Sequence, residues 1–319
     1  MDGPLKNLLV VDLTRVLVGP YCTMILSDLG ARVIKVEAPE IGDDSRKFGP
    51  FVQDYSAYFM SLNRGKESIA LNLKNEDDKK IFDKILSKAD ILVENFKPGT
   101  LKKWGYGWDE VNKKYPKLIY ASASGFGQTG PLKELPAYDM VVQGMGGLMS
   151  VTGQPNSEPT RVGTSIGDIT AGLFTAIGIN AALYDRQKTG KGMFIDVSML
   201  DCQIAILENA IARYLSKNEI PEPMGSRHPA IAPFEAFKTK DSYIIVAAGN
   251  DKLFEKLCNV LKIPEVSIDE KFNSNSARAK NIDKLKIILE NKLSSKSTTD
   301  WVNEMEKERI PCGPIYNIK

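Results

Sequence analysis

The sequence predicts an α/β fold: an open, doubly wound, Rossmann-like parallel sheet, followed by a smaller α+β domain. Two observations carry this prediction. Over about the first 125 residues, short runs rich in Ile, Val and Leu alternate with helical patterns, and these runs lack the polar–apolar alternation of a half-exposed strand. Near residue 216 the pattern changes, and a hairpin followed by helices is predicted instead.

The first part contains five predicted strands, which are Leu8–Leu13, Arg32–Glu37, Ser68–Leu73, Ile91–Asn95 and Leu118–Ser122. The predicted helices between them are Pro20–Leu29, Ala57–Asn63, Glu76–Ala89 and Trp108–Tyr115. Asn75 is a favourable cap for the third of these helices, because acidic residues follow it in the first turn. Such strand–helix alternation is typical of βαβ units and a parallel sheet.

Further along the chain, we predict apolar helices at 138–149 and 168–187, a strand at Phe194–Val197 and a helix at Leu200–Ser216. Two prolines and a glycine in residues 217–225 indicate a linker. A hairpin of Phe234–Phe237 and Tyr243–Ala247 follows, then helices near 252–261, 277–293 and 298–308. The predicted domains are therefore residues 1–216, which are large and Rossmann-like, and residues 226–319, which are smaller.

Composition excludes several classes of protein. With 42 basic and 40 acidic residues and no basic block, the chain is a poor candidate for nucleic-acid binding. The longest apolar stretch, Ile169–Leu183, is interrupted and shorter than the roughly 20 residues of a membrane span. The apolar run near the N-terminus is too short for a signal peptide. We therefore expect no membrane partner.

The cysteines and the single histidine bear on redox state and metals. The four cysteines lie far apart without a CxxC pair, which fits free thiols in a reducing cytoplasm: Cys22, Cys202, Cys258 and Cys312. His228 is the only histidine, so imidazoles are too few for most catalytic zinc sites. A Ser–His–Asp triad would need His228 itself, which we interpret as structural. No metal is expected.

Asp168 is the principal candidate for chemistry. It stands where an apolar helix rich in small residues is predicted to begin. Asp is a preferred N-cap residue, so capping is one interpretation. The other is nucleophilic attack, since the helix N-terminus would keep the carboxylate charged while apolar surroundings remove its water. The local sequence leaves both open.

Three other segments carry candidate ligand-binding residues. The glycines of Gly125–Pro131 follow a predicted strand and suit either backbone contacts to an anion or a simple turn. Phe96 could stack on a base, while Lys97, Lys102 and Lys103 could meet phosphates or remain solvated. Asp139, after Tyr138, fits a helix cap or a catalytic acid.

Several motifs occur in a characteristic order along the chain. They are Val11–Pro20, Leu29–Glu37, Gly42–Arg46, Asn63–Lys66, Val93–Gly99, Ser124–Pro131, Pro136–Asp139, Gly167–Asp168 and Lys188–Gly192. In this order, over nearly the whole chain, the sequence resembles the class III CoA-transferases (the CaiB/BaiF family). The resemblance implies an interlaced homodimer that moves CoA from an acyl-CoA donor to a small carboxylic acid, with CoA as substrate and no other cofactor.

The resemblance also assigns roles to residues. Asp168 matches the nucleophile that forms an aspartyl anhydride and then an aspartyl-CoA thioester, and Asp139 matches an active-site acid. The positions that match CoA contacts are Val16, Leu17, Leu71, Asn72, Asn95, Phe96, Lys97, Lys103, Ala137 and Tyr138. The activated aspartyl group must be kept from water.

Some features depart from the family pattern and keep alternatives open. Ala38 stands where a formyl-CoA relative has a CoA-binding arginine, which Arg46 or Lys47 could replace, and Leu17 stands where that relative has a polar amide. We expect the chain to lack the C-terminal segment that returns to the large domain. The alternatives are an acyl-CoA racemase or epimerase, disfavoured because Tyr138 stands where these carry His, and a non-catalytic CoA-binding subunit. Residues 225–250 resemble those of members that handle dicarboxylates.

Overall fold

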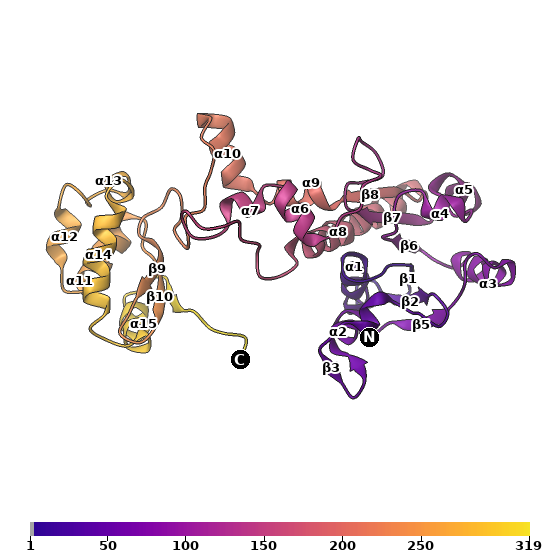
Figure 1. Ribbon diagram of the computed structural model, residues 1–319, viewed down its shortest axis with the longest axis horizontal. Helices are drawn as coiled ribbons and strands as arrows, with labels where there is room; N and C mark the ends of the chain where they lie inside the picture. Colours follow the sequence, from indigo (N-terminus) through magenta and orange to yellow (C-terminus); the bar gives the residue numbers. More distant parts are fainter. Residues whose placement is uncertain (1–2) are drawn as a thin grey trace. The chain divides into compact units, whose positions relative to one another are not determined.

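The computed structural model describes residues 3–319, which divide into two compact units (Figure 1). Unit 1 contains the residues up to Val151 together with Pro159–Pro221, and unit 2 contains Thr152–Glu158 together with Glu222–Lys319. The sequence analysis did not assign Thr152–Glu158 to the second domain. The chain therefore enters unit 2 twice.

Unit 1 is built on a six-stranded parallel sheet with the order β5-β2-β1-β6-β7-β8. Its strands are β1 (Leu9–Asp12), β2 (Arg32–Glu37), β5 (Glu67–Ala70), β6 (Ile91–Glu94), β7 (Ile119–Ser124) and β8 (Phe194–Ser198). The chain builds outward from β1 on one side and then returns to β6 on the other. The topological switch point, where such sheets bind ligands, therefore lies between β1 and β6.

Helices cover both faces of this sheet, as the doubly wound prediction requires. One layer contains α1 (Val18–Asp28) and α8 (Ile166–Thr189), and the other contains α3 (Glu76–Leu86), α4 (Thr100–Lys103) and α5 (Trp108–Lys114). Val10 and Val11 of β1 explain the absence of polar alternation. Val10 packs into the core with α1 and α8, while Val11 packs into the core with α3. The predicted mixed α/β fold with a parallel sheet is confirmed.

Shorter elements complete unit 1. They are η1 (Asp44–Lys47), β3 (Phe51–Val52), β4 (Tyr55–Ser56), α2 (Ala57–Asn63), α6 (Asp139–Met145), α7 (Leu148–Val151), α9 (Met199–Ala205) and α10 (Glu208–Lys217). Two predicted helices are each broken into two. The first breaks at Gly147, whose φ of +84° lies in the left-handed region, and the second at Ile206–Leu207. Apolar spacing continues across both breaks, so the pattern alone did not reveal them.

Unit 2 has a three-stranded antiparallel sheet with the order β11-β10-β9. Its elements are β9 (Phe234–Lys238), β10 (Tyr243–Ala247), α11 (Asp251–Val260), α12 (Pro264–Ile268), α13 (Asn275–Lys280), α14 (Ile282–Leu293), α15 (Thr298–Lys307) and β11 (Cys312–Pro314). The helix predicted at 277–293 is interrupted at Asn281. Phe237, Phe254 and Trp301 lie in one apolar core.

The α8 helix spans unit 1 and is longer than the sequence suggested. It has 24 residues, so the expectation of a stretch too short for a membrane was wrong: it is the one helix of residues 3–319 that is long and apolar enough to cross one. Half of the relevant window is buried, where α8 packs on α1 and the sheet, and a core helix passes the same test. Near its C-terminal end, Arg186 pairs with Asp90 at 3.0 Å, and Asp90 also accepts the N–H of Leu9.

Close packing of α8 on α1 depends on Gly172, one turn beyond Asp168. A Cβ atom at Gly172 would lie 2.8 Å from the carbonyl oxygen of Val18. We expect Gly172→Val to lower the free energy of unfolding by about 1–3 kcal/mol, because α8 must move away from α1. Urea denaturation measures this effect. Gly163→Ala is the control, since a Cβ there meets open space, and an equal loss in both variants would contradict the packing argument.

Candidate active site

A cavity of about 600 Å³ opens at the carboxyl ends of β1, β2, β5 and β6. Its lining includes Leu71, Asn72 and Phe96, three of the predicted CoA-contact positions, together with the cationic side chains Arg15 and Lys74. This is the position beside the switch point where an open α/β sheet binds its ligand. Arg15 was missed by the sequence analysis, although its place directly after a buried strand was a usable signal.

Asn95 bridges the switch point by bonding to the backbone of Arg15. Its Oδ1 accepts the N–H of Arg15 at 2.8 Å, and its Nδ2 donates to the C=O of Arg15, also at 2.8 Å. Both ends of the carboxamide are therefore used in holding the loop after β1. Next to it, the Phe96 ring meets Trp104 edge-on at 5.4 Å, with the guanidinium of Arg15 5.5 Å from its centroid.

Arg46 was considered as a replacement for the arginine absent at position 38. The structure shows its guanidinium bonded to both carboxylate oxygens of Glu37 at 2.7 Å and lying 3.8 Å from the centroid of the Phe59 ring. These contacts fix Arg46 beside the cavity. Arg15 and Lys74 are the cations that line the cavity itself.

Asp168 lies in the first turn of α8, but it does not cap the helix. The helix begins at Ile166, with Ser165 at the cap position, so the capping interpretation of Asp168 was wrong. The side chain is half-buried and makes no hydrogen bond or ion pair within residues 3–319. Burial, and then the negative charge of Asp139, raise the pKa of Asp168 to about 7. Desolvation therefore acts against the expected effect of the helix N-terminus, which favours the charged carboxylate.

Asp139 supplies the cap that α8 needs. It is buried at the first position of α6, and its Oδ1 accepts the N–H of Gly167 at 2.8 Å. Its Oδ2 accepts Nε2 of Gln143 at 2.7 Å, and Oε1 of Gln143 accepts the N–H of Val162. A Cβ at position 167 would lie 3.0 Å from Oδ1 of Asp139, so the motif requires glycine there. Asp139 thus fixes the turn that carries Asp168.

The loop after β1 reaches α8 through a shared apolar cluster. Val18 at the start of α1, Val142 of α6 and Ala171 of α8 pack together in this cluster. Val16 and Leu17 connect Arg15, which lines the cavity, to Val18, which packs in this cluster with α8. Leu17 is buried, and Val16 has a φ of +66°.

The remaining predicted contact positions lie around this region. Ala137 packs against Gly125, where a Cβ would come within 2.3 Å of the Ala137 side chain, and Tyr138 is 77% exposed directly before α6. Lys97 lines a neighbouring cavity of about 390 Å³, and its Nζ lies 3.7 Å from the Glu134 carboxylate. Lys103 lies exposed on α4.

Tyr58 of α2 was not singled out by the sequence. Burial raises the pKa of its phenol to about 12, with further contributions from the charges of Asp168, Asp43 and Asp139. The hydroxyl therefore remains protonated at neutral pH and is a hydrogen-bond donor within the field of these acids. The helix that carries Tyr58 was predicted, but the hairpin of β3 and β4 before it was not, so nothing in the sequence connected this tyrosine with the site.

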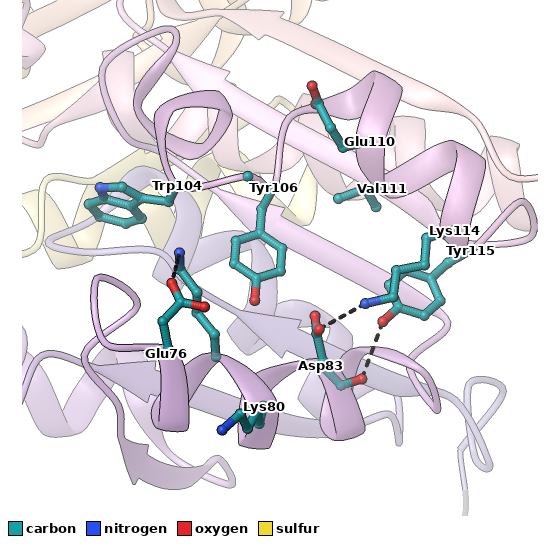
Figure 2. A pocket seen from close by; sticks show the side chains of 11 residues that line it. Glu76, Lys80, Asp83, Trp104, Tyr106, Glu110, Val111, Lys114 and Tyr115 are labelled. Atoms are coloured by element: carbon teal, nitrogen blue, oxygen red, sulfur yellow. Dashed lines mark hydrogen bonds and ion pairs between the residues drawn. The ribbon is translucent and has the colours of Figure 1, made fainter.

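A further pocket of about 260 Å³ lies between α3 and the α4–α5 segment (Figure 2). Four of its charged side chains form two pairs: Lys79 bonds Glu76, and Lys114 bonds Asp83, each at 2.8 Å. The pocket contains none of the predicted site residues, and it shares only Trp104 with the cavity at the switch point. Within residues 3–319, no group of three or more His, Cys, Asp or Glu side chains is placed to hold a metal ion.

Comparison with known proteins agrees with this arrangement. The sequence profile of CoA-transferase family III matches residues 5–319. The acetyl-CoA:oxalate CoA-transferase of Acetobacter aceti is 49% identical, covering 99% of this chain and 82% of that protein. The human succinyl-CoA:glutarate CoA-transferase is 42% identical, with 99% and 72% covered. The crystal structure of a CAIB/BAIF family protein from Brucella suis superimposes with a TM-score of 0.88 at 42% identity, covering 100% of this chain and 85% of that one.

The structure combines a Rossmann-like sheet that has a cavity at its switch point with a poorly solvated aspartate in the first turn of α8. The chain belongs to CoA-transferase family III, the family that its ordered motifs resemble. It is therefore a CoA-transferase, and its substrates are acyl-CoA and carboxylic acids.

The raised pKa of Asp168 predicts a pH dependence. A carboxylate nucleophile attacks only when it is ionised, so kcat/KM for acyl-CoA should rise with pH, with a midpoint near pH 7, and level off about one pH unit above it. Asp139→Asn removes the neighbouring negative charge, which should lower the pKa of Asp168 and move the midpoint to lower pH. Asp185→Asn, also on α8, should leave the profile unchanged. A midpoint that stays in place or rises in Asp139→Asn would contradict the assignment.

Proposed function

We propose that this CoA-transferase works through Asp168 as a covalent nucleophile. The observation that carries the proposal is the carboxylate itself, which is half-buried, without a hydrogen-bond or ion-pair partner in residues 3–319, and has its pKa raised to about 7. A poorly solvated carboxylate is a strong nucleophile toward a thioester, because little hydration must be removed before attack.

The reaction proceeds through balanced exchanges of acyl groups. A carboxylate oxygen of Asp168 attacks the thioester carbonyl of the donor, CoA thiolate leaves, and an aspartyl–acyl anhydride forms. The thiolate then attacks the aspartyl carbonyl, so the donor acid leaves as its carboxylate and an aspartyl-CoA thioester remains. The acceptor carboxylate attacks the carbonyl of this thioester, CoA thiolate leaves again, and a second aspartyl–acyl anhydride forms. The thiolate finally attacks the acceptor's acyl carbonyl and frees Asp168, with no net change in redox state or proton count.

CoA is proposed to bind in the cavity at the switch point and to reach Asp168 along the loop after β1. Arg15 and Lys74 supply positive charge for its phosphates, and Phe96 supplies an aromatic wall. Val16 and Leu17 connect Arg15 of this cavity to Val18, which packs with α8, and we propose that they contact the thioester end of CoA. Asp139 fixes the first turn of α8 by accepting the N–H of Gly167, and its negative charge contributes to the raised pKa of Asp168.

The substrates are proposed to be short. The relatives named above act with acetyl-CoA and oxalate, or with succinyl-CoA and glutarate, so a dicarboxylic acid is the preferred acceptor.

A cytoplasmic homodimer is also proposed. Free cysteines are consistent with a reducing compartment, and the exposed Ile177 and Tyr184 on α8 offer apolar surface to a second copy.

Trapping tests the nucleophile. After incubation with an acyl-CoA donor, hydroxylamine should convert the activated Asp168 to a hydroxamate, which peptide mass spectrometry locates. Asp168→Asn should lose the adduct and about a thousandfold or more in kcat, since no other group replaces a covalent nucleophile. Asp185→Asn, on the same helix, should keep both. An adduct at another residue, or full activity in Asp168→Asn, would sink the mechanism.

A substrate panel tests the acceptor class. Acetyl-CoA and succinyl-CoA are each offered with oxalate, succinate, glutarate and a monocarboxylate of matched length, and product CoA esters are followed by chromatography. We expect kcat/KM to be about tenfold or more higher for dicarboxylates, because a second carboxylate adds a charge-assisted hydrogen bond. Equal values for the monocarboxylates would contradict a dicarboxylate site.

A further inference from the structure

A buried ion pair lies beside the loop that follows β1. Nζ of Lys35, on β2, is 2.9 Å from Oδ2 of Asp43, just before η1, and the two side chains are 1% and 0% exposed. Removing two charges from water costs several kcal/mol per ion unless their remaining polar atoms are also bonded. The other hydrogen bonds of these two side chains therefore indicate the role of the pair.

Both members of the pair bond the backbone of the loop. Nζ of Lys35 donates to the C=O of Thr14 at 2.7 Å, and Oδ1 of Asp43 accepts the N–H of Val16 at 3.1 Å. Between these positions, Asn95 holds the N–H and C=O of Arg15. Three successive residues of the loop are thus fixed by side chains that come from other parts of the sheet.

Val16 is the strained member of this loop. Its φ of +66° lies in the left-handed region, which a β-branched side chain disfavours at a cost on the order of 1–3 kcal/mol. Such a conformation persists only where the surroundings impose it, and the N–H that Asp43 accepts belongs to this residue. The bend at Val16 places Leu17 at the cap position of α1.

Asp43 is itself held rigidly. Its Oδ1 also accepts the N–H and Oγ of Ser45 at 2.9 and 2.7 Å, and its own N–H donates to Glu37 at 3.0 Å. Burial alone would raise the pKa of Asp43, but the charge of Lys35 and the bonds from Ser45 hold it below its ordinary value. The group therefore remains ionised and able to accept at neutral pH.

We propose that Lys35 and Asp43 are positioning residues for the transfer reaction, whose buried side chains hold Thr14–Leu17 in the shape that acyl-CoA meets. Asp43 is also among the residues that line the cavity, but its side chain is fully buried. The inference rests on the proposed function, because it takes Val16 and Leu17 as CoA contacts. A pair that served stability alone would leave the affinity for CoA unchanged.

Kinetics and hydrogen exchange test the proposal together. Asp43→Asn and Lys35→Met should each raise KM for acyl-CoA about tenfold or more while kcat stays within about threefold. The double variant should be no worse than the poorer single variant, because the two residues act as a unit. In the unliganded protein, deuterium exchange of the peptide that covers Val16 should be faster in Asp43→Asn.

Glu235→Gln is the control, because Glu235 is a buried carboxylate of unit 2 that pairs with the partly exposed Lys286 at 2.5 Å. It should lower Tm but change neither KM nor exchange at Val16. If Asp43→Asn does not fold, Asp43→Glu replaces it. This variant keeps the charge but moves it, so KM should rise by less than is measured for Lys35→Met.

An unchanged KM in folded Asp43 and Lys35 variants overturns the proposal, whether exchange at Val16 is faster or not. Trapping of the Asp168 adduct tests the proposed function separately, because formation of the adduct does not depend on this loop.

Discussion

The hydrogen bond from the N–H of Gly167 to the carboxylate of Asp139 is the contact on which the site depends. It joins the start of α8 to α6 across 28 residues of sequence, and it fixes the turn in which Asp168 stands. The same carboxylate contributes to the raised pKa of Asp168. One side chain therefore fixes the turn that carries the proposed nucleophile and adds to the effect of burial on its pKa.

Burial acts on several acids of unit 1, yet their pKa values move in opposite directions. Asp12 is completely buried, but Lys66, Lys35 and two threonine hydroxyls outweigh the desolvation and hold its pKa well below the usual range. Lys35 and Ser45 likewise hold the pKa of Asp43 below its ordinary value. No cation or hydrogen-bond donor lowers the pKa of Asp168, so desolvation raises it. The acids that shape the loop are compensated, and the proposed nucleophile is not.

The sequence predicted those parts of the structure that depend on local patterns. Runs rich in apolar residues located all six parallel strands, most clearly β6 and β7, which are buried along their whole length. The same patterns could not locate the break at Gly147 or assign Lys35 to the interior, since a lysine within a strand looks like a surface residue. Asp139 could be predicted as a cap, but the helix that it caps lies elsewhere in the chain. The ordered motifs identified the family without giving the geometry that joins them.

The length of α8 sets a mechanical constraint on the protein. Asp168 lies at one end of this helix, and Arg186 is anchored to Asp90 near the other, about five turns further on. A one-residue insertion or deletion between them would rotate one end relative to the other by about 100°. The aspartate would then turn away while the anchor stayed in place. The number of residues in this segment is therefore constrained separately from its composition, in which Gly172 is required for packing on α1.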